Sequence, residues 1–250
     1  MIPYLGNKTS ISDFLKQYVP KNPKKWIEPF GGVFGLYFTL NLRHYPDTEF
    51  IYNDVNPLNC ILFEHLKNKI FIEKVKSTNV TKELFIKSYE SIISDEETKK
   101  GKKIIKSSNS EEKALAWLII LCCGDSKELM LKKFTGNSAF EILKYKLPMY
   151  VEYFKRIQIS NLDYKEILKQ HDSEETFFYL DPPYVGFEDY YVNNRFKGDS
   201  HTELSNELKS LKGKWLLSYY KFDKLEDWYS NYKIVSHKNN ISEEFLILGL

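Results

Sequence analysis

The chain has 250 residues, a formal net charge of +2 and 42% hydrophobic residues, which is enough for one sizeable core. Its three cysteines lack the spacing of a disulfide framework or a zinc site, which indicates reduced thiols and a cytoplasmic protein. No basic region followed by an apolar run opens the chain, and the longest apolar run, 114–123, is too short to cross a membrane. The composition therefore argues against a secreted, zinc-binding or membrane-spanning protein.

The first 70 residues alternate between helical and strand patterns. Short strands are expected at 26–28 and 49–52, and helices at 11–18, 33–42 and 57–68. Pro57 suits the first turn of the last of these helices. This alternation is typical of a parallel α/β sheet.

The middle of the chain, 70–154, has a different character, rich in Lys, Ser and Glu with few strand signals. Helices are expected at 82–93 and 111–122, and a turn at 135–138. The window 99–156 holds thirteen basic and six acidic residues, a net charge of +7. A solvated helical face would explain this excess, and so would an insert that grips phosphate groups.

The α/β pattern resumes near residue 157. The expected strands are 156–159, 176–180, 214–218, 233–235 and 244–250, and the expected helices are 164–170, 202–211 and 222–229. Five histidines are scattered along the chain and form no cluster in the sequence, so each is expected to be a surface or packing residue.

The most informative motif is Asp181-Pro182-Pro183-Tyr184, which follows the apolar strand 177–180. Two prolines cannot continue a strand, so the motif is expected at a sheet edge. Asp181 and a proline-linked carbonyl can accept the two N–H bonds of an exocyclic amine, and Tyr184 can stack on the ring that carries it. The alternative is a rigid turn with an Asx contact.

Two further motifs follow the first two strands. Gly31, Gly32 and Gly35 allow a ligand to approach the backbone closely, and the helix that follows offers free N–H groups. Asp54 closes the second strand, where a carboxylate can accept hydrogen bonds from ribose hydroxyls. The alternative for the glycine turn is a turn without a ligand, and the alternatives for Asp54 are a helix N-cap and a turn aspartate.

Together these segments resemble the Dam-type (D12 class) DNA adenine-N6 methyltransferases. Four stretches carry the resemblance in family order: Tyr4-Leu5-Gly6-Asn7-Lys8, Glu28-Pro29-Phe30-Gly31-Gly32-Val33-Phe34-Gly35, Asn53-Asp54-Val55-Asn56-Pro57-Leu58 and Asp181-Pro182-Pro183-Tyr184. Weaker echoes are 161–164, 217–220 and 244–247. Tyr4 stands where many relatives carry Trp, and Pro3 where a basic residue is frequent.

The resemblance implies a doubly wound, Rossmann-like methyltransferase sheet made of residues 1–69 and 155–250, with 70–154 as an inserted, mostly helical DNA-recognition domain. It implies S-adenosylmethionine as cofactor, double-stranded DNA as substrate, no metal, and a bacterial or phage-infected cytoplasm, with a cognate restriction enzyme as a further candidate partner. The catalytic residues would be Asp181, Pro182 and Tyr184. The implied cofactor-binding residues are Tyr4, Lys8, Phe30, Gly32, Asp54, Asp163 and Asp181, and the implied DNA-binding residues are Lys132, Lys133 and Asn137.

Other functions remain open at the level of sequence. Methylation of cytosine N4 or of an RNA base would use a similar motif, and a non-catalytic DNA-binding subunit could share the fold. The intact Asp181, Tyr184 and glycine turn argue against the second of these. A nicotinamide oxidoreductase would need fingerprint glycines at a spacing that this chain lacks.

Overall fold

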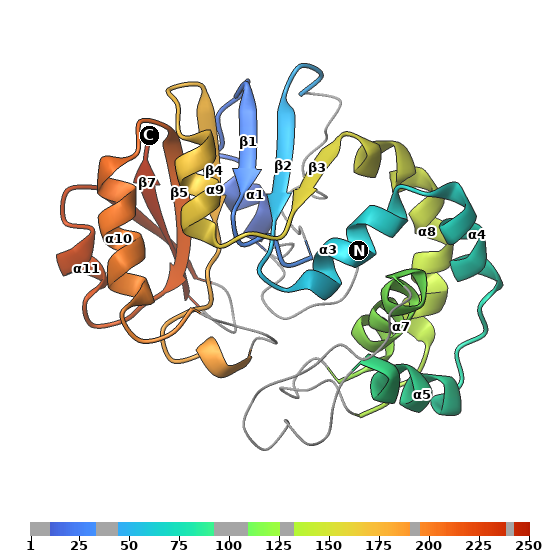
Figure 1. Ribbon diagram of the computed structural model, residues 1–250. Helices are drawn as coiled ribbons and strands as arrows, with labels where there is room; N and C mark the ends of the chain where they lie inside the picture. The colour runs from blue at the N-terminus through green and yellow to red at the C-terminus, as the bar shows by residue number, and fades with distance from the viewer. Residues whose placement is uncertain (1–10, 34–44, 93–109, 126–132, 191–195, 239–242) are drawn as a thin grey trace.

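A seven-stranded sheet in the order β3-β2-β1-β4-β5-β7-β6 forms the centre of the molecule (Figure 1). The computed structural model describes residues 11–33, 45–92, 110–125, 133–190, 196–238 and 243–250. The strands are β1 (Lys25–Glu28), β2 (Glu49–Asn53), β3 (Ile157–Ser160), β4 (Thr176–Leu180), β5 (Lys214–Tyr220), β6 (Lys233–Lys238) and β7 (Glu243–Gly249). The strands from β3 to β5 in this spatial order are parallel, as expected, whereas β7 runs antiparallel to both β5 and β6.

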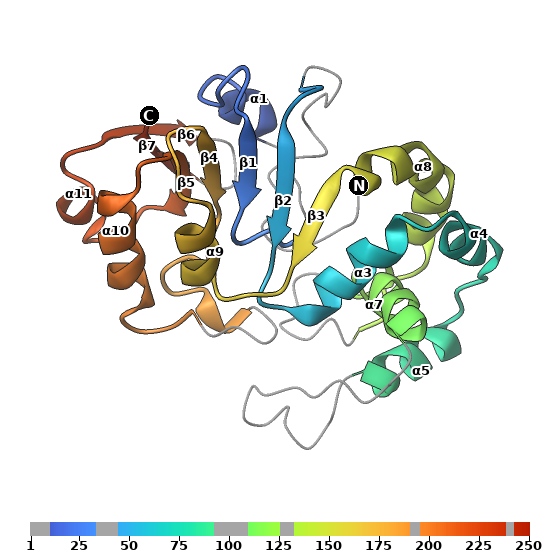
Figure 2. The ribbon, with the colours of Figure 1, turned by 45° about the horizontal axis from the view of Figure 1, so that its top comes forward.

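Helices cover both faces of this sheet. The helices of the described residues are α1 (Ser12–Leu15), α3 (Pro57–Leu66), α4 (Lys69–Ser77), α5 (Lys82–Ile92), α7 (Ser110–Cys123), α8 (Ser138–Lys155), α9 (Tyr164–His171), α10 (Ser200–Ser210) and α11 (Leu225–Trp228), with a 3-10 helix η3 (Glu188–Tyr190). α9, α10 and α11 lie on one face and α1 on the other (Figure 2). Because strand side chains alternate, Ile27 and Phe178 enter the core under α9 and α10, and Trp26 and Phe177 enter the opposite core.

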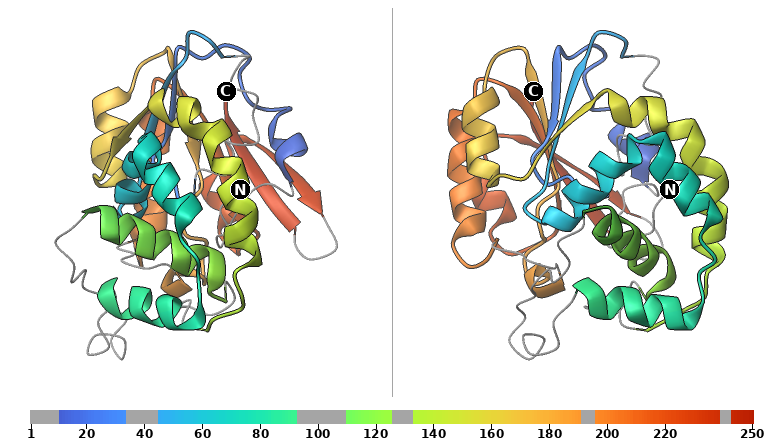
Figure 3. Two further views of the ribbon diagram at one scale, coloured as in Figure 1. Left: turned by 90° about the vertical axis from the view of Figure 1, so that its right-hand side faces the viewer. Right: turned by 45° about the vertical axis from the view of Figure 1, so that its right-hand side comes forward.

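The helices α4, α5, α7 and α8 come between α3 and β3 and gather beside the β3 edge of the sheet (Figures 1 and 3). Their helical character agrees with the expectation for residues 70–154. They continue the core of the α1 face rather than forming a separate one. Trp117 of α7 is fully buried, and its Nε1 donates to Asn59 Oδ1 of α3 at 2.9 Å, which joins the helical segment to the helix that follows β2.

Two helices of this segment, α4 and α8, were not predicted individually. α8 contains Pro148, and a proline ordinarily breaks or kinks a helix. Its apolar residues 140, 143, 147, 151 and 154 recur every three or four positions and are buried, so tertiary packing outweighs the local cost of the proline. The helix expected at 33–42 falls almost wholly outside the described residues.

Candidate active site

The strand order reverses between β1 and β4, because β2 and β3 lie on one side of β1 and β4 lies on the other. In open α/β sheets, ligands bind beyond the carboxyl ends of the strands at such a switch point. β1 ends at Glu28, directly before the glycine turn, and β4 ends at Leu180, directly before Asp181. The fold therefore brings two of the predicted motifs to the same end of neighbouring strands.

The glycine turn after β1 is fastened to β2. Gly31 N donates to Asn53 O at 2.8 Å, and Tyr52 Oη donates to Gly32 O at 2.7 Å. A Cβ atom at Gly31 would lie 2.2 Å from the Tyr52 ring, and Gly32 has a φ of 50°. Both positions therefore need glycine, and the turn can keep its backbone close to a ligand.

Asp54 is buried at the end of β2 and contacts this turn. Its Oδ2 accepts from Gly32 N at 2.7 Å, and its Oδ1 accepts from Asn56 N at 2.7 Å. Burial raises the pKa of Asp54 to about 6, although these two N–H groups pull it down. Asn56, not Asp54, caps α3, since its Oδ1 accepts from Leu58 N at 3.1 Å. The helix-cap alternative for Asp54 was therefore wrong.

The remaining predicted cofactor residues in the described chain lie around the same turn. The ring of Phe30 packs 5.1 Å from that of Tyr164 and 5.4 Å from that of Phe196. Asp163 is exposed and caps α9 by accepting from Lys165 N at 3.0 Å. The predicted residues Tyr4 and Lys8 lie outside the described residues.

The catalytic motif follows β4 with Asp181 half-buried and Pro182 and Tyr184 buried. Burial, followed by the charge of Asp181, raises the pKa of Tyr179 and that of Tyr184 well above the usual value. Only 5% of Tyr184 is exposed, and its ring centroid lies 4.5 Å from that of Tyr220. The Asp181 carboxylate therefore stands among buried aromatic side chains, where its charge acts strongly.

The structure adds partners of the motif that the sequence did not indicate. Tyr184 Oη donates to the carboxylate of Glu244 on β7, and it lies 2.9 Å from Ser218 Oγ on β5. In the sequence, both residues belong only to the weaker echoes of the family. Ser218 and Glu244 follow Tyr184 by 34 and 60 residues, and no local pattern in the sequence shows that their strands contact the motif.

A second group links the segment after the motif to α10. His201 is 3% exposed, with Nδ1 at 2.8 Å from Tyr219 Oη and Nε2 at 2.9 Å from Glu188 Oε1. Burial lowers the pKa of His201, against the opposing effect of Glu188. His201 is thus a packing residue that joins η3, α10 and β5.

Two of the three predicted DNA-binding residues are described. Lys133 is exposed, and the Asn137 amide donates to Val80 O at 3.1 Å. Phe134 forms an antiparallel bridge with Gly124, and Thr135 N donates to Cys123 O at 2.8 Å. This pairing places the expected turn at 135–138 beside the end of α7, whereas Lys132 lies outside the described residues.

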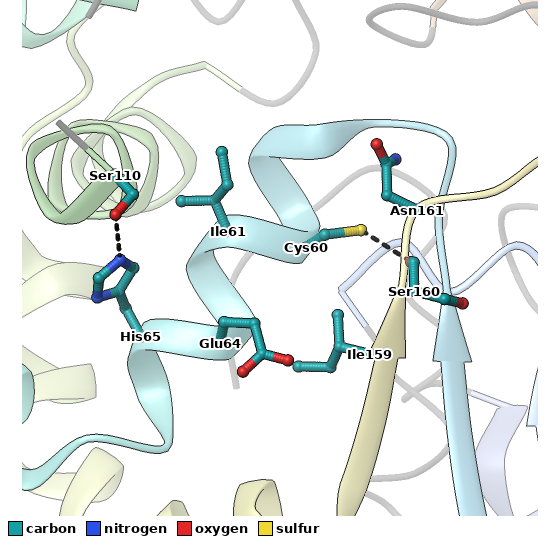
Figure 4. Close-up of a pocket in the computed structure, with 8 residues that line it drawn as sticks. All are labelled: Cys60, Ile61, Glu64, His65, Ser110, Ile159, Ser160 and Asn161. Carbon is teal, nitrogen blue, oxygen red and sulfur yellow. Dashed lines mark hydrogen bonds between the residues drawn. The ribbon is translucent and has the colours of Figure 1, made fainter. Parts of the chain in front are cut away.

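A pocket of about 290 Å³ opens between α3, the start of α7 and β3 (Figure 4). Its lining consists of Cys60, Ile61, Glu64, His65, Ser110, Ile159, Ser160 and Asn161. It adjoins the Asp54 loop, because the Asn161 amide donates to Asp54 O at 2.6 Å. Since Gly32, Asp54 and Asp181 do not line it, we place the candidate active site at the switch point instead.

The cysteines do not supply a nucleophile. All three are buried, and burial raises the pKa of Cys60 and that of Cys123 to about 12, so both remain thiols. Within the described residues, no group of three or more His, Cys, Asp or Glu side chains could hold a metal ion. The described helices include none that is long and apolar enough to span a membrane.

A doubly wound sheet, a glycine turn and an acidic residue after the second strand are typical of α/β proteins that bind nucleotides. Residues 4–242 match the family model of the D12 class N6 adenine-specific DNA methyltransferases, so the chain belongs to this family. It is an enzyme that methylates adenine N6 in DNA.

Comparison with solved structures gives weaker likenesses. A conserved hypothetical protein of Streptococcus pyogenes is 10% identical with a TM-score of 0.42, covering 97% of this chain and 95% of its own. The rRNA methyltransferase AviRa of Streptomyces viridochromogenes is 11% identical with a TM-score of 0.41, covering 100% and 86%. At these values the likenesses carry no argument. No curated protein matches the chain.

Proposed function

We propose that this chain transfers the methyl group of S-adenosylmethionine to N6 of an adenine flipped out of double-stranded DNA. The observation that carries the proposal is the placement of Asp54 and Asp181 after β2 and β4, on either side of the glycine turn that follows β1. The Asp54 carboxylate would accept hydrogen bonds from the cofactor, and the Asp181 carboxylate would accept them from the target amine.

The residues around the glycine turn fit such a cofactor. A carboxylate has about four acceptor positions, and the N–H groups of Gly32 and Asn56 use two of those of Asp54. Ribose hydroxyls would be the further donors. Phe30 would flank the cofactor, and Asp163 would accept from its adenine amine. Tyr4 and Lys8 would complete the site from the amino-terminal segment.

The chemistry requires an acceptor and good alignment. Bound S-adenosylmethionine supplies a methyl group on a sulfonium. The sulfur leaves as a neutral thioether, so no metal is needed to activate the leaving group. Asp181 and the Pro182 carbonyl would accept the two N6–H bonds and stabilise the positive charge that develops on the nitrogen. Holding the amine in line with the methyl group would provide much of the remaining rate gain.

The target base must leave the duplex to reach Asp181. Tyr184 would stack on it, which is worth roughly 1–3 kcal/mol per base. Because only 5% of Tyr184 is exposed, we expect the rings around it to rearrange when the base enters. Burial, then the charges of Asp181 and Glu244, raises the pKa of Tyr184 far above neutrality, so its hydroxyl stays protonated.

The helical segment 70–154 would act as the DNA-recognition domain, with Lys132, Lys133 and Asn137 at the DNA. A substitution that removes one cationic group from a phosphate should reduce the slope of log affinity against log salt by about 0.9. Lys133→Glu should therefore weaken DNA binding, whereas Lys212→Glu, which lies before β5 at the opposite end of the sheet, should not. An unchanged slope for Lys133→Glu would move the DNA-binding surface elsewhere.

The activity itself is tested with labelled S-adenosylmethionine and duplex DNA, followed by separation of the nucleosides. Label in N6-methyl-2′-deoxyadenosine is the expected result. Label only in cytosine, only in RNA or in neither would overturn the proposal. Mapping modified bases in host DNA would give the recognition sequence, and a nuclease in the same cytoplasm that cleaves only the unmethylated sequence would be the cognate restriction enzyme.

A further inference from the structure

Three buried oxygen atoms meet behind the catalytic motif. Tyr184 Oη and Ser218 Oγ both donate to Glu244 Oε1, and the two hydroxyl oxygens lie 2.9 Å apart. Tyr184 follows β4, Ser218 lies on β5 and Glu244 lies on β7. The group therefore joins three neighbouring strands at one point.

The burial of this group makes its hydrogen bonds important. Glu244 and Tyr184 are 5% exposed, and Ser218 is fully buried. A buried carboxylate is costly unless donors satisfy it, and the two hydroxyls provide donors. In the sheet register Glu244 pairs with Tyr220 and Leu246 with Ser218, so Glu244 and Ser218 are diagonal neighbours on one face.

These contacts decide what Tyr184 can do. A tyrosine hydroxyl has one proton, and here that proton points to Glu244 rather than to a substrate. The ring itself packs against two other tyrosine rings. Its centroid lies 4.5 Å from that of Tyr220 and 5.7 Å from that of Tyr219. Glu244 thus fixes the hydroxyl end of the ring, while Tyr220 and Tyr219 pack beside it.

We propose that Glu244 is a positioning residue, which anchors the Tyr184 hydroxyl and thereby orients the ring face that receives the flipped adenine. The proposal rests on the stacking role of Tyr184 given above. Ser218 supports the anchor by donating to the same carboxylate oxygen. Glu244 itself would touch neither the base nor the cofactor.

The test compares Glu244→Ala, Glu244→Gln, Tyr184→Phe and the double variant Tyr184→Phe/Glu244→Ala. Capture of the base is followed by the fluorescence of 2-aminopurine at the target position in duplex DNA, and cofactor affinity by calorimetry. Glu244→Ala and Tyr184→Phe should each weaken capture roughly tenfold, and the double variant should be no worse than either single one. Glu244→Gln keeps an acceptor and should recover most of the loss.

Glu243→Ala is the matched control, because Glu243 is the preceding residue of β7 and points to the other face of the sheet. It should leave capture unchanged. If the losses of the two single variants multiply in the double variant, Glu244 does not act through Tyr184. If Glu244→Ala lowers only the thermal midpoint and capture is intact, the carboxylate is structural. Either outcome overturns the proposal.

The wild-type protein separates this proposal from the function on which it rests. If it fails to transfer methyl groups or to capture 2-aminopurine, the proposed function fails. Thermal midpoints of the four variants then still show whether Glu244 and Tyr184 are coupled. Coupling in the midpoints without capture would reduce the group to a structural contact.

Discussion

The two halves of the candidate site are held together in different ways. Around the glycine turn, backbone groups make most of the contacts: Gly31 N to Asn53 O, and the N–H groups of Gly32 and Asn56 to Asp54. Around Asp181, the contacts join side chains, as in the group of Tyr184, Ser218 and Glu244. Backbone contacts need a few residues of the right shape, whereas side-chain contacts need specific residues from distant strands.

This contrast has a functional meaning. The first half would hold a cofactor that always has the same shape, and a rigid backbone cradle suits it. The second half would admit a base that enters from a duplex, and buried side chains can repack around such a base. Four changes test how far the two halves act separately, from the largest expected effect to the smallest.

Asp181→Asn should cause the largest loss. The amide would present a donor where the target amine needs an acceptor, and removing such electrostatic stabilisation costs about 10²- to 10³-fold. Single-turnover methyl transfer at saturating cofactor measures the effect. Asp189→Asn, at an exposed residue of the following 3-10 helix, is the control. A loss confined to cofactor affinity would assign Asp181 to the other half of the site.

Asp54→Ala should lower the affinity for S-adenosylmethionine by at least about tenfold, because charge-assisted hydrogen bonds are worth roughly 1.5–3 kcal/mol each. Calorimetric titration measures it. Asp172→Ala is a matched control, because Asp172 also accepts two backbone N–H bonds, from Lys212 and Gly213 at 2.9 Å, but before β4 begins. Equal affinities for wild type and Asp54→Ala would leave Asp54 with a purely structural role.

The pKa of about 6 for Asp54 predicts a pH dependence of cofactor binding. Below pH 6 the protonated carboxyl is a weaker acceptor, and affinity should fall by up to about tenfold per pH unit. The contribution of this group to stability has the opposite sign. Because folding raises its pKa, the contribution of Asp54 to the free energy of unfolding increases as pH falls from about 6 towards 3.8.

Titrations at pH 7.5, 6.5 and 5.5, with the thermal midpoint recorded at each pH, separate these two effects for Asp54. Asp54→Ala should remove the pH dependence of cofactor affinity. If the variant keeps that dependence, another group is responsible.

Asp163 should give the smallest effect on stability and the sharpest separation of two roles. Loss of the α9 cap in Asp163→Ala should cost about 1 kcal/mol in the free energy of unfolding. Asp163→Asn retains a capping oxygen, so its stability should match the wild type. Cofactor affinity distinguishes the roles: a loss in both variants supports contact with the adenine amine, and no loss in either leaves Asp163 as a helix cap.

The same contrast explains how much the sequence could predict. Strands β1, β2 and β4 were predicted because each is a short apolar run ended by Gly, Asp or Pro. Gly31, Gly32, Asp54 and Asp181 were found because each stands directly after such a run. Their placement depends on local chain geometry, which a short motif specifies well.

Features that depend on contacts between distant segments were missed. Glu244 and Ser218 have no local pattern that points to Tyr184, and His201 gave no sign that it joins Glu188 to Tyr219. Pro148 argued against a continuous helix at α8. Buried side chains such as Leu143 and Leu147 nevertheless stabilise the helix through tertiary packing. The antiparallel entry of β7 between β5 and β6 was likewise not apparent.

The position of β7 affects the order in which the protein can assemble during synthesis. β6 leaves the ribosome before β7, yet its place in the sheet lies beyond β7, so β5 keeps an unpaired edge until residues 243–249 emerge. An unpaired edge strand is a template for aggregation. Glu244 arrives on the strand that closes this edge, so Tyr184 is anchored in the same step. On the proposed role of Glu244, a nascent chain should therefore capture a flipped base less tightly until this hairpin has docked.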